Sequence, residues 1–301
     1  MCGIGGFIRR SGNDSHLIIK KMVFSMRHRG PDDEGTCILA VNGHDVVFGH
    51  RRLAIIDLSS SGHQPMVDSL TGCVLIYNGE IYNYRELTRN LKNEGCVFRG
   101  SSDTEVLLNS LIHYGTACLQ NLDGMFAFAF FDPRNKKLVL GRDPFGIKPL
   151  YYYFKAGKLY FASEIRALIY GGVPELKIDK KSLCDFFCFG SYQSPSTFFD
   201  NIKMFPAGCF QEFFIEEEGV VAGQMNRYWD FPELEKTFNE TNVCEEIKKQ
   251  FTSAVKSHLI SDVPVGIFLS SGMDSTLITS IASKQNSEIC LLYTSPSPRD
   301  S

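Results

Sequence analysis

The chain has 301 residues, of which 44% are hydrophobic and 22% are charged, the composition of an ordinary globular protein with room for two domains. Its 31 Lys and Arg residues nearly balance 34 Asp and Glu residues, for a net charge of -3. A nucleic-acid or anionic-membrane partner is therefore not expected. The first residues do not resemble a signal peptide and no segment is apolar enough to span a membrane, so we expect a cytoplasmic protein.

Ten cysteines are scattered from Cys2 to Cys290 without any C-x-x-C pair. Disulfide frameworks are typical of short secreted chains, so we expect reduced thiols here. Cys184 and Cys188 lie four residues apart in the apolar stretch LCDFFCF, which predicts one face of a helix. We expect these two side chains to pack there rather than to bind a metal.

The first two thirds of the chain alternate short apolar stretches with Gly and Pro turns. Apolar residues three and four apart predict helices at 84–92 and 104–113, and Ser102 with Glu105 has the spacing of a capping box before the second helix. Strands packed with helices and joined by hairpins predict a layered α+β domain up to about residue 210. The predicted hairpins are 125–131 with 138–141 around DPRNKK, and 151–154 with 159–162 around Ala156 and Gly157.

The composition changes after residue 210. Segment 211–240 holds the acidic run EEEG and the only tryptophan, and we interpret it as a connection between domains. Segment 241–289 predicts a helix, a buried strand (VPVGIFL), the tight turn SSGMDS and a second helix at 276–283, which is the opening of an α/β nucleotide-binding domain. Asn242, with Glu245 three residues later, predicts the start of the first of these helices. Its apolar residues recur every four positions, at Val243, Ile247, Phe251, Val255 and Leu259.

Cys2 follows the initiator methionine and becomes the amino terminus once Met1 is removed. A free α-amino group titrates near ~7.7 to 8.0, so it can take the proton of the thiol beside it and return it to a leaving group. This is the N-terminal nucleophile arrangement. Glycines 3, 5 and 6 leave room for the backbone to approach a substrate closely. A cysteine at this position is inert in most proteins, so the pattern alone leaves both interpretations open.

Six further segments occur in order: MRHRGPDDEG, GHRRLAIIDL, YNGEIYNYREL, GSSDTEVLL, LDGMFAFAFFD and GRDPFGIKPLYY. Together with Cys2 they resemble the glutaminase domain of glutamine-hydrolysing asparagine synthetases over almost all of residues 1–210. The resemblance implies a class II amidotransferase domain, folded as an α+β N-terminal-nucleophile sandwich with α-β-β-α layers. It also implies that Cys2 attacks the side-chain amide of glutamine.

Two charged residues match the positions that recognise glutamine in this family. Arg52 can bind a carboxylate with two donors, although it could equally be a surface cation; the resemblance aligns it, rather than Arg51, with the α-carboxylate. Asp103 could simply be an acidic residue in the first turn of a helix, where the helix dipole stabilises a negative charge. The resemblance implies instead that its carboxylate faces the α-ammonium of glutamine.

The Asn78-Gly79 dipeptide is on its own a strong hairpin-turn signal. The resemblance implies instead that the Asn78 side-chain amide and the Gly79 backbone N–H form an oxyanion hole, and it places Glu80 beside them in the substrate site. His28 and His50 are other candidates for a general base, but the N-terminal amine fills that role and we do not expect either to be catalytic.

The second motif, SSGMDS, resembles the SGGxDS pyrophosphate loop of enzymes that split ATP into AMP and pyrophosphate. A turn between a buried strand and a helix presents backbone N–H groups and hydroxyls to an anion. Ser271 replaces a glycine of the pattern, which is tolerated if its φ stays negative. The resemblance implies an ATP and Mg²⁺ site in which Asp274 contacts the metal and the pyrophosphate, with binding residues Leu269, Ser270, Gly272, Asp274 and Ser275.

For a complete enzyme the resemblance implies transfer of ammonia to a β-aspartyl-adenylate made from ATP and aspartate, and, because the family often pairs, a homodimer. An amidotransferase acting on another acceptor, such as a surface sugar or a peptide, and a non-catalytic glutamine-binding module are the alternatives. The final segment, 290–301 (CLLYTSPSPRDS), is unlike the family, and we interpret it as disordered or foreign sequence on a shortened synthetase domain.

Overall fold

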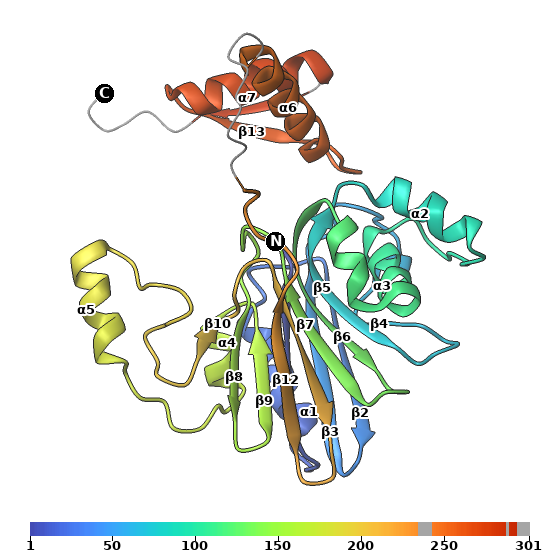
Figure 1. Ribbon diagram of the computed structural model, residues 1–301, viewed down its shortest axis with the longest axis vertical. Coiled ribbons are helices and arrows are strands. Elements are labelled where there is room, and N and C mark those ends of the chain that lie inside the picture. The colour runs from blue at the N-terminus through green and yellow to red at the C-terminus, as the bar shows by residue number, and fades with distance from the viewer. Residues whose placement is uncertain (234–242, 287–288, 294–301) are drawn as a thin grey trace. The chain divides into compact units, whose positions relative to one another are not determined.

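The computed structural model describes residues 1–233, 243–286 and 289–293. The chain divides into two compact units, Met1–Phe231 and Pro232–Ser301 (Figure 1).

The first unit is built on two six-stranded antiparallel sheets. In spatial order, the first sheet contains β10 (Lys203–Met204), β8 (Tyr151–Lys155), β9 (Lys158–Ala162), β1 (Gly3–Arg10), β3 (His44–Arg52) and β2 (Asp33–Val41). The second contains β12 (Val220–Arg227), β11 (Cys209–Ile215), β7 (Lys137–Arg142), β6 (Gly124–Asp132), β5 (Val74–Ile81) and β4 (Met66–Val67).

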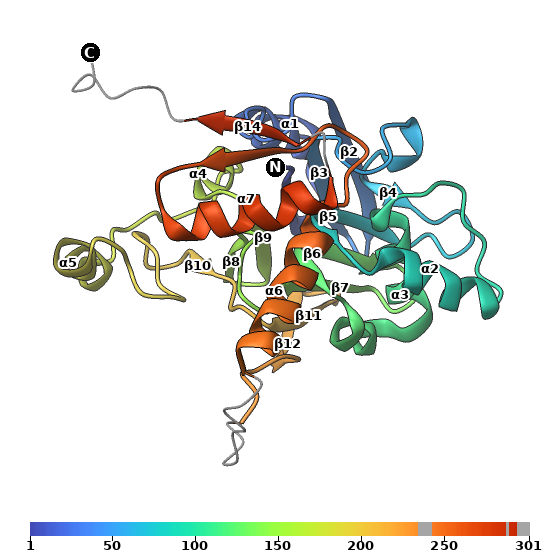
Figure 2. The same cartoon turned by 90° about the horizontal axis from the view of Figure 1, so that it is seen from above.

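Helices cover the outer face of each sheet, which gives the predicted α-β-β-α sandwich (Figures 1 and 2). On the first sheet lie α1 (Ser15–Ser25) and α4 (Ile165–Tyr170). On the second lies α3 (Asp103–Tyr114), with α2 (Tyr84–Asn93) and the short helix η2 (Gly115–Asn121) packed against α3. Two further helices, η1 (Ser60–Gly62) and α5 (Lys180–Phe189), lie in the connections.

In strand β1, alternate side chains pack on opposite faces of the first sheet. Its side chains alternate, so that Ile4 and Ile8 enter the core between the two sheets while Phe7 packs toward α1 and α4. Gly3 and Gly5 face α1, where an added Cβ would lie 3.2 to 3.4 Å from methionine side chains. Close packing against these methionines is therefore a second reason for small residues at both positions, beside the predicted approach of a substrate.

Local patterns predicted part of this unit, namely the hairpins β6–β7 and β8–β9 and the helices α2 and α3. Strands β6 and β7, and β8 and β9, pair as antiparallel hairpins, the second with positive φ at both Ala156 and Gly157. The Ser102 hydroxyl accepts the Glu105 N–H at 3.2 Å, as a helix cap should. The Glu105 carboxylate, however, accepts from the N–H groups of Arg99 and Gly100, at 2.7 and 2.8 Å, and so secures the loop before α3.

The connection between the units starts later than the expected residue 211. Strands β11 and β12 occupy most of 211–227 and extend the second sheet, and Tyr228 donates its hydroxyl to the Arg142 carbonyl at 2.8 Å. The acidic run is the turn of this hairpin, closed by a 3.0 Å bond from the Glu216 N–H to the Gly219 carbonyl. The acidic run was mistaken for a linker because a solvent-exposed hairpin turn has the same polar composition as a linker.

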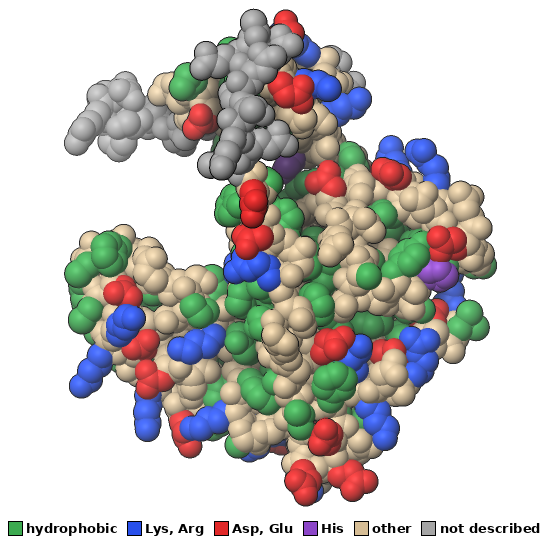
Figure 3. Space-filling view, viewed as in Figure 1, with side chains coloured by type: hydrophobic (Ala, Val, Ile, Leu, Met, Phe, Trp, Pro, Cys, Tyr) green, Lys and Arg blue, Asp and Glu red, His purple; other side chains and the backbone are tan. Residues whose placement is uncertain are grey.

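The expected packing of Cys184 and Cys188 is also wrong. Both lie on α5, which forms as predicted, but both are exposed, and Ser182 is the one buried residue of that helix. Figure 3 shows apolar side chains at this part of the surface, where Phe187 and Phe189 are 79% and 69% exposed. All ten cysteines of the chain, each in the described part, are free thiols.

The second unit has the predicted order of helix, strand, turn and helix. It contains α6 (Val243–His258), β13 (Gly266–Leu269), α7 (Met273–Gln285) and β14 (Cys290–Tyr293). The expected helix start at Asn242 lies outside the described residues. Of the α6 apolar stripe, Val255 is buried and Ile247 is 62% exposed. None of the described helices is long and apolar enough to cross a membrane.

Strand β14 corrects the interpretation of the last segment. Residues 290–293 pair in parallel with β13, from Gly266 opposite Cys290 to Leu269 opposite Tyr293. The segment is unlike the family in sequence, but the pairing of its first four residues makes them the second strand of an α/β unit. The rest of that interpretation, on residues 294–301, lies outside the described residues.

Candidate functional site

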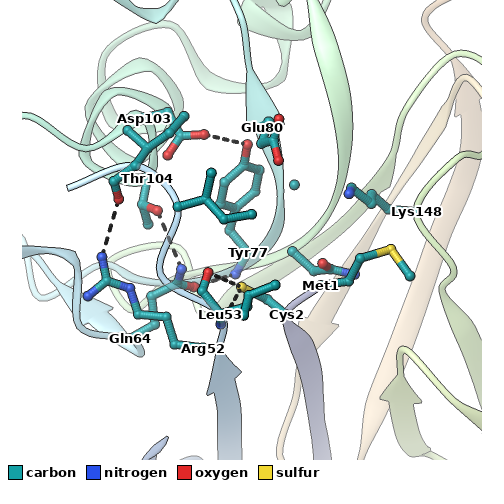
Figure 4. A pocket seen from close by; sticks show the side chains of 14 residues that line it. Met1, Cys2, Arg52, Leu53, Gln64, Tyr77, Glu80, Asp103, Thr104 and Lys148 are labelled. Carbon is teal, nitrogen blue, oxygen red and sulfur yellow. Dashed lines mark hydrogen bonds between the residues drawn. The ribbon is translucent and has the colours of Figure 1, made fainter. Parts of the chain in front are cut away.

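A pocket at one end of the sandwich collects every predicted residue of the glutamine site (Figure 4). Cys2 precedes β1, Arg52 ends β3, Asn78, Gly79 and Glu80 lie in β5, and Asp103 begins α3. These residues are up to about a hundred positions apart in the chain, so only the closing of the two sheets on each other brings them together. The other lining residues are Met1, Leu53, Ile55, Ile56, Gln64, Tyr77, Thr104 and Lys148.

The Cys2 side chain is held by the backbone of Leu53. The Leu53 N–H donates to Sγ at 3.3 Å, and the thiol lies 3.6 Å from the Leu53 carbonyl (Figure 4). Arg29 donates Nε to the Cys2 carbonyl at 2.8 Å and so secures the backbone. Burial raises the pKa of the Cys2 thiol, so the nucleophile needs a base to become a thiolate at neutral pH.

Met1 lines the pocket beside Cys2, and burial lowers the pKa of its α-amino group. While Met1 is attached, the nitrogen of Cys2 belongs to a peptide bond and has no basic lone pair. Removal of Met1 would create an amine on the same residue as the thiol. The geometry therefore connects processing of the terminus with the supply of a base.

Asn78 and Gly79 lie inside a strand, so the hairpin-turn alternative is excluded. In β5 they stand opposite Ala127 and Phe126 of β6. Both the N–H and the carbonyl of Phe126 bond to Asp143, at 3.2 and 2.8 Å, so the pair Gly79 and Phe126 is not hydrogen-bonded. The Gly79 N–H therefore points to the open edge of β5, away from β6.

The same edge carries the neighbouring N–H groups two residues away on each side. The Tyr77 N–H donates to Gln64 Oε1 at 2.6 Å, and the Ile81 N–H donates to Asp103 Oδ2 at 3.1 Å. Gly79 lies between them. Only glycine fits there, because an added Cβ would lie 2.3 Å from the Met125 carbonyl oxygen.

Asn78 is 1% exposed, and its Nδ2 has no hydrogen-bond partner within the described part of the chain. An unpaired buried amide donor costs about 1 to 3 kcal/mol, so natural proteins rarely keep one without a use. Asn78 and Gly79 both line the pocket that holds Cys2. This pair can stabilise a negative oxygen that develops near the thiol.

Arg52 lines the pocket and Arg51 does not. The Arg52 guanidinium donates to the carbonyls of Ile56, Asp57 and Ser59 and is thereby held in place. Arg51 turns away and pairs with Glu34 at 2.6 Å. A guanidinium held by a loop offers its remaining donors to an anion in a fixed direction.

Asp103 is 5% exposed at the first position of α3. Its Oδ2 accepts from the Tyr77 hydroxyl at 2.9 Å as well as from the Ile81 N–H. Burial raises the pKa of Asp103 to about 6, although these hydrogen bonds favour the charged form. A cationic ligand group beside it would lower that pKa and bind more tightly as the carboxylate ionises.

Neither histidine considered from the sequence lines the pocket. His28 is half exposed and pairs with Glu164 at 2.7 Å. His50 is buried, and burial lowers its pKa to about 3, so it is neutral at physiological pH. Its Nε2 lies 3.2 Å from the Tyr77 carbonyl. His50 therefore supports the strand that carries Asn78 rather than facing the thiol.

The sequence did not single out Gln64, Tyr77, Thr104 or Lys148 as site residues. Three of them lie within the quoted motif segments, which was the available signal, whereas Gln64 lies outside all six. Lys148 reaches the pocket because Asp143 accepts its backbone N–H at 2.9 Å. Burial lowers the Lys148 pKa, while Glu80 and Cys2 favour its charged form.

The loop of the second unit has the hydroxyls of its motif turned toward each other. Ser270 Oγ and Ser275 Oγ lie 2.9 Å apart, and Gly272 donates its N–H to Ser270 Oγ at 3.2 Å. Ser271 does not have a positive φ, so the replacement of glycine is sterically tolerated. Asp274 lies in the first turn of α7, and Leu269 ends β13.

Two antiparallel sheets between helices are the fold of N-terminal-nucleophile glutamine amidotransferases, and here one pocket is lined by a cysteine before a central strand, an asparagine, a glycine, an arginine and an aspartate. The chain belongs to the glutamine amidotransferase domain family, whose model matches residues 1–229. A second model, described as asparagine synthase, matches residues 246–297.

Similar proteins agree with this assignment. A putative glutamine-hydrolysing asparagine synthetase of Methanocaldococcus jannaschii is 35% identical over 93% of this chain and 56% of that protein. Asparagine synthetase 1 of Bacillus subtilis is 37% identical over 94% of this chain and 44% of that protein. The chain thus spans about half the length of these curated relatives. The glutamine phosphoribosylpyrophosphate amidotransferase of B. subtilis, solved with ADP and GMP, shares the fold, with a TM-score of 0.55 at 16% identity over 99% of this chain and 69% of that one.

Proposed function

We propose that this chain hydrolyses glutamine to glutamate and ammonia, with Cys2 as the nucleophile once Met1 is removed. The α-amino group of Cys2 takes the thiol proton, and Sγ attacks the side-chain amide carbon of glutamine. The amino group then gives its proton to the departing nitrogen, and ammonia leaves. Water attacks the resulting thioester, which frees glutamate and restores the thiol.

Substrate recognition is divided between two charged side chains. Arg52 binds the α-carboxylate, and Asp103 binds the α-ammonium, with Glu80 beside it in the same pocket. A zwitterion held at both charges has its side-chain amide directed at Cys2. This arrangement selects a free amino acid over a peptide.

One observation carries the proposal: Asn78 and Gly79 line the pocket of Cys2, and each has an N–H donor that is not used to pair β5 with β6. The buried Asn78 Nδ2 has no partner within the described residues, and the strand register directs the Gly79 N–H to the open edge of β5, away from β6. Together they would hold the oxyanion of the tetrahedral intermediate, a role typically associated with about 10²- to 10³-fold in rate for each donor.

For the second unit we propose binding of ATP and Mg²⁺ at the Ser270–Ser275 loop, and in the whole protein the amidation of aspartate to asparagine. Residues Leu269, Ser270, Gly272, Asp274 and Ser275 would surround the phosphates. A loop with hydroxyls, backbone N–H groups and one carboxylate suits Mg²⁺, which protein sites hold through few carboxylates together with phosphate oxygens. ATP would activate the acceptor carboxylate. We further propose a cytoplasmic homodimer.

Treatment with 6-diazo-5-oxo-norleucine, an electrophilic glutamine analogue, tests the glutaminase. We expect a single adduct on Cys2 in protein that lacks Met1, identified by peptide mass spectrometry, and loss of ammonia release. Protein that retains Met1 should not react at the same rate. An unmodified Cys2 in processed protein would exclude the mechanism and would favour a non-catalytic glutamine-binding module.

A further inference from the structure

Tyr77 occupies an unusual place between the oxyanion site and the aspartate. It is 2% exposed and precedes Asn78 in β5, yet its side chain turns to α3, where its hydroxyl donates to Asp103 Oδ2 at 2.9 Å (Figure 4). Burial raises the Tyr77 pKa well above its ordinary value, so the hydroxyl stays protonated and remains a donor throughout the neutral range.

The backbone of Tyr77 is held on the edge that β4 leaves uncovered. β4 pairs with β5 only as far as Leu75, so the next groups along that edge need side-chain partners. Gln64 Oε1 accepts the Tyr77 N–H at 2.6 Å, and His50 Nε2 lies 3.2 Å from the Tyr77 carbonyl. These two contacts fix the backbone from which the Tyr77 ring extends.

Gln64 also connects this strand with the start of α3. Its Nε2 donates to Thr104 Oγ1 at 3.4 Å, one residue after Asp103. The Tyr77 hydroxyl and the Gln64 amide thus make two parallel links from β5 to the first turn of α3. Of these two links, the one from the Tyr77 hydroxyl reaches the Asp103 carboxylate directly.

The charges around Asp103 decide what this hydroxyl contributes. Glu80 of β5 repels a second negative charge, and burial in the pocket also favours the neutral acid. Arg52 from β3, Cys2 before β1 and Lys148 from the turn after β7 line the same pocket. Since a carboxylate is stabilised by donors, the Tyr77 hydroxyl and the Ile81 N–H oppose protonation at this position.

We propose that the Tyr77 hydroxyl is a positioning element that keeps Asp103 ionised and aimed at the α-ammonium of the substrate, and so determines selectivity for a free amino acid. This inference rests on the proposed glutaminase function. Tyr77 does not touch the reacting amide carbon or Cys2 in this scheme, and it acts only through Asp103.

Substitution Y77F removes the hydroxyl and keeps the ring. We expect the KM for glutamine at pH 7 to rise about tenfold, in line with loss of a hydrogen bond to a charged group, while kcat changes by less than about threefold. The acid limb of kcat/KM should move to higher pH because Asp103 then protonates more easily. Y153F is the matched control, since Tyr153 is also 2% exposed but packs in the core under α1 and α4.

Calorimetric titration of glutamine separates this inference from the catalytic proposal. In the C2A background, which cannot turn over, adding Y77F should weaken binding about tenfold at pH 7 and by less at pH 8. Adding Y77F to D103N should have almost no further effect, because the carboxylate it serves is gone. Equal loss of affinity at all pH values, an additive effect on D103N, or unchanged binding would each overturn the positioning role. Absence of ammonia release from the unmodified protein would instead count against the glutaminase.

Discussion

The glutamine pocket and the Ser270–Ser275 loop are built in different ways. In the pocket, Asn78 and Asp103 are almost fully buried, and contacts such as Cys2 with Leu53 and Tyr77 with Asp103 join distant parts of the chain. In the loop, the exposed hydroxyls of Ser270 and Ser275 bond to each other and to backbone no more than five residues away. The pocket thus depends on the whole sandwich, whereas the loop depends on one strand-turn-helix segment.

Replacement of the nucleophile should cause the largest loss of glutaminase activity. We expect C2A to lower ammonia release from glutamine by more than about 10³-fold, because no other thiol lines the pocket within the described residues. The half-buried Cys96 lies outside the pocket, so C96A should keep normal turnover. Turnover that survives C2A would show that the chemistry lies elsewhere. The measurement is a coupled assay of ammonia.

Loss of the amide donor should have the next largest effect. We expect N78A to lower kcat by about 10²- to 10³-fold with a small change in KM, because the oxyanion exists only during reaction. N226A serves as the control, since Asn226 is exposed on β12 and its amide donates to the nearby Gln224 carbonyl. A change confined to KM would contradict the oxyanion role.

The aspartate should control affinity and its pH dependence. Burial raises the Asp103 pKa to about 6, so the carboxylate is charged above that pH and neutral below it. The kcat/KM for glutamine should therefore fall as pH decreases through about 6, and D103N should raise KM by about 10- to 100-fold at pH 8 and remove that limb. D185N, on α5 outside the pocket, should retain it. An unchanged limb in D103N would assign it to another group.

A substitution in the Ser270–Ser275 loop should have the smallest effect on glutamine turnover. Ser271 is exposed and does not have a positive φ, so S271G restores the family pattern without relieving strain. We expect glutamine turnover to change by less than about twofold, since the pocket is assembled entirely from the first unit. The ammonia assay used for C2A measures this. A large change would show that the pocket and the loop are energetically coupled.

Local patterns predicted those parts of the fold that local physics decides. The Ala156-Gly157 turn and the Ser102 cap were predicted because the required backbone conformations and donors lie within a few residues. Strands β11 and β12 were missed because the polar turn between them, at Glu216, resembles a linker in composition. Exposure of Cys184 was missed because an apolar helix face does not say whether anything covers it.

The order of the motif segments was enough to select Cys2, Arg52, Asn78, Gly79 and Asp103, all of which line one pocket. Their environment was decided only by the tertiary structure. The Gly79 N–H faces the pocket because Phe126 bonds to Asp143, and Tyr77 reaches Asp103 across 26 residues of sequence. Burial then sets the Asp103 pKa near 6. Such properties depend on which distant groups exclude water and offer hydrogen bonds, and no local pattern of residues contains that information.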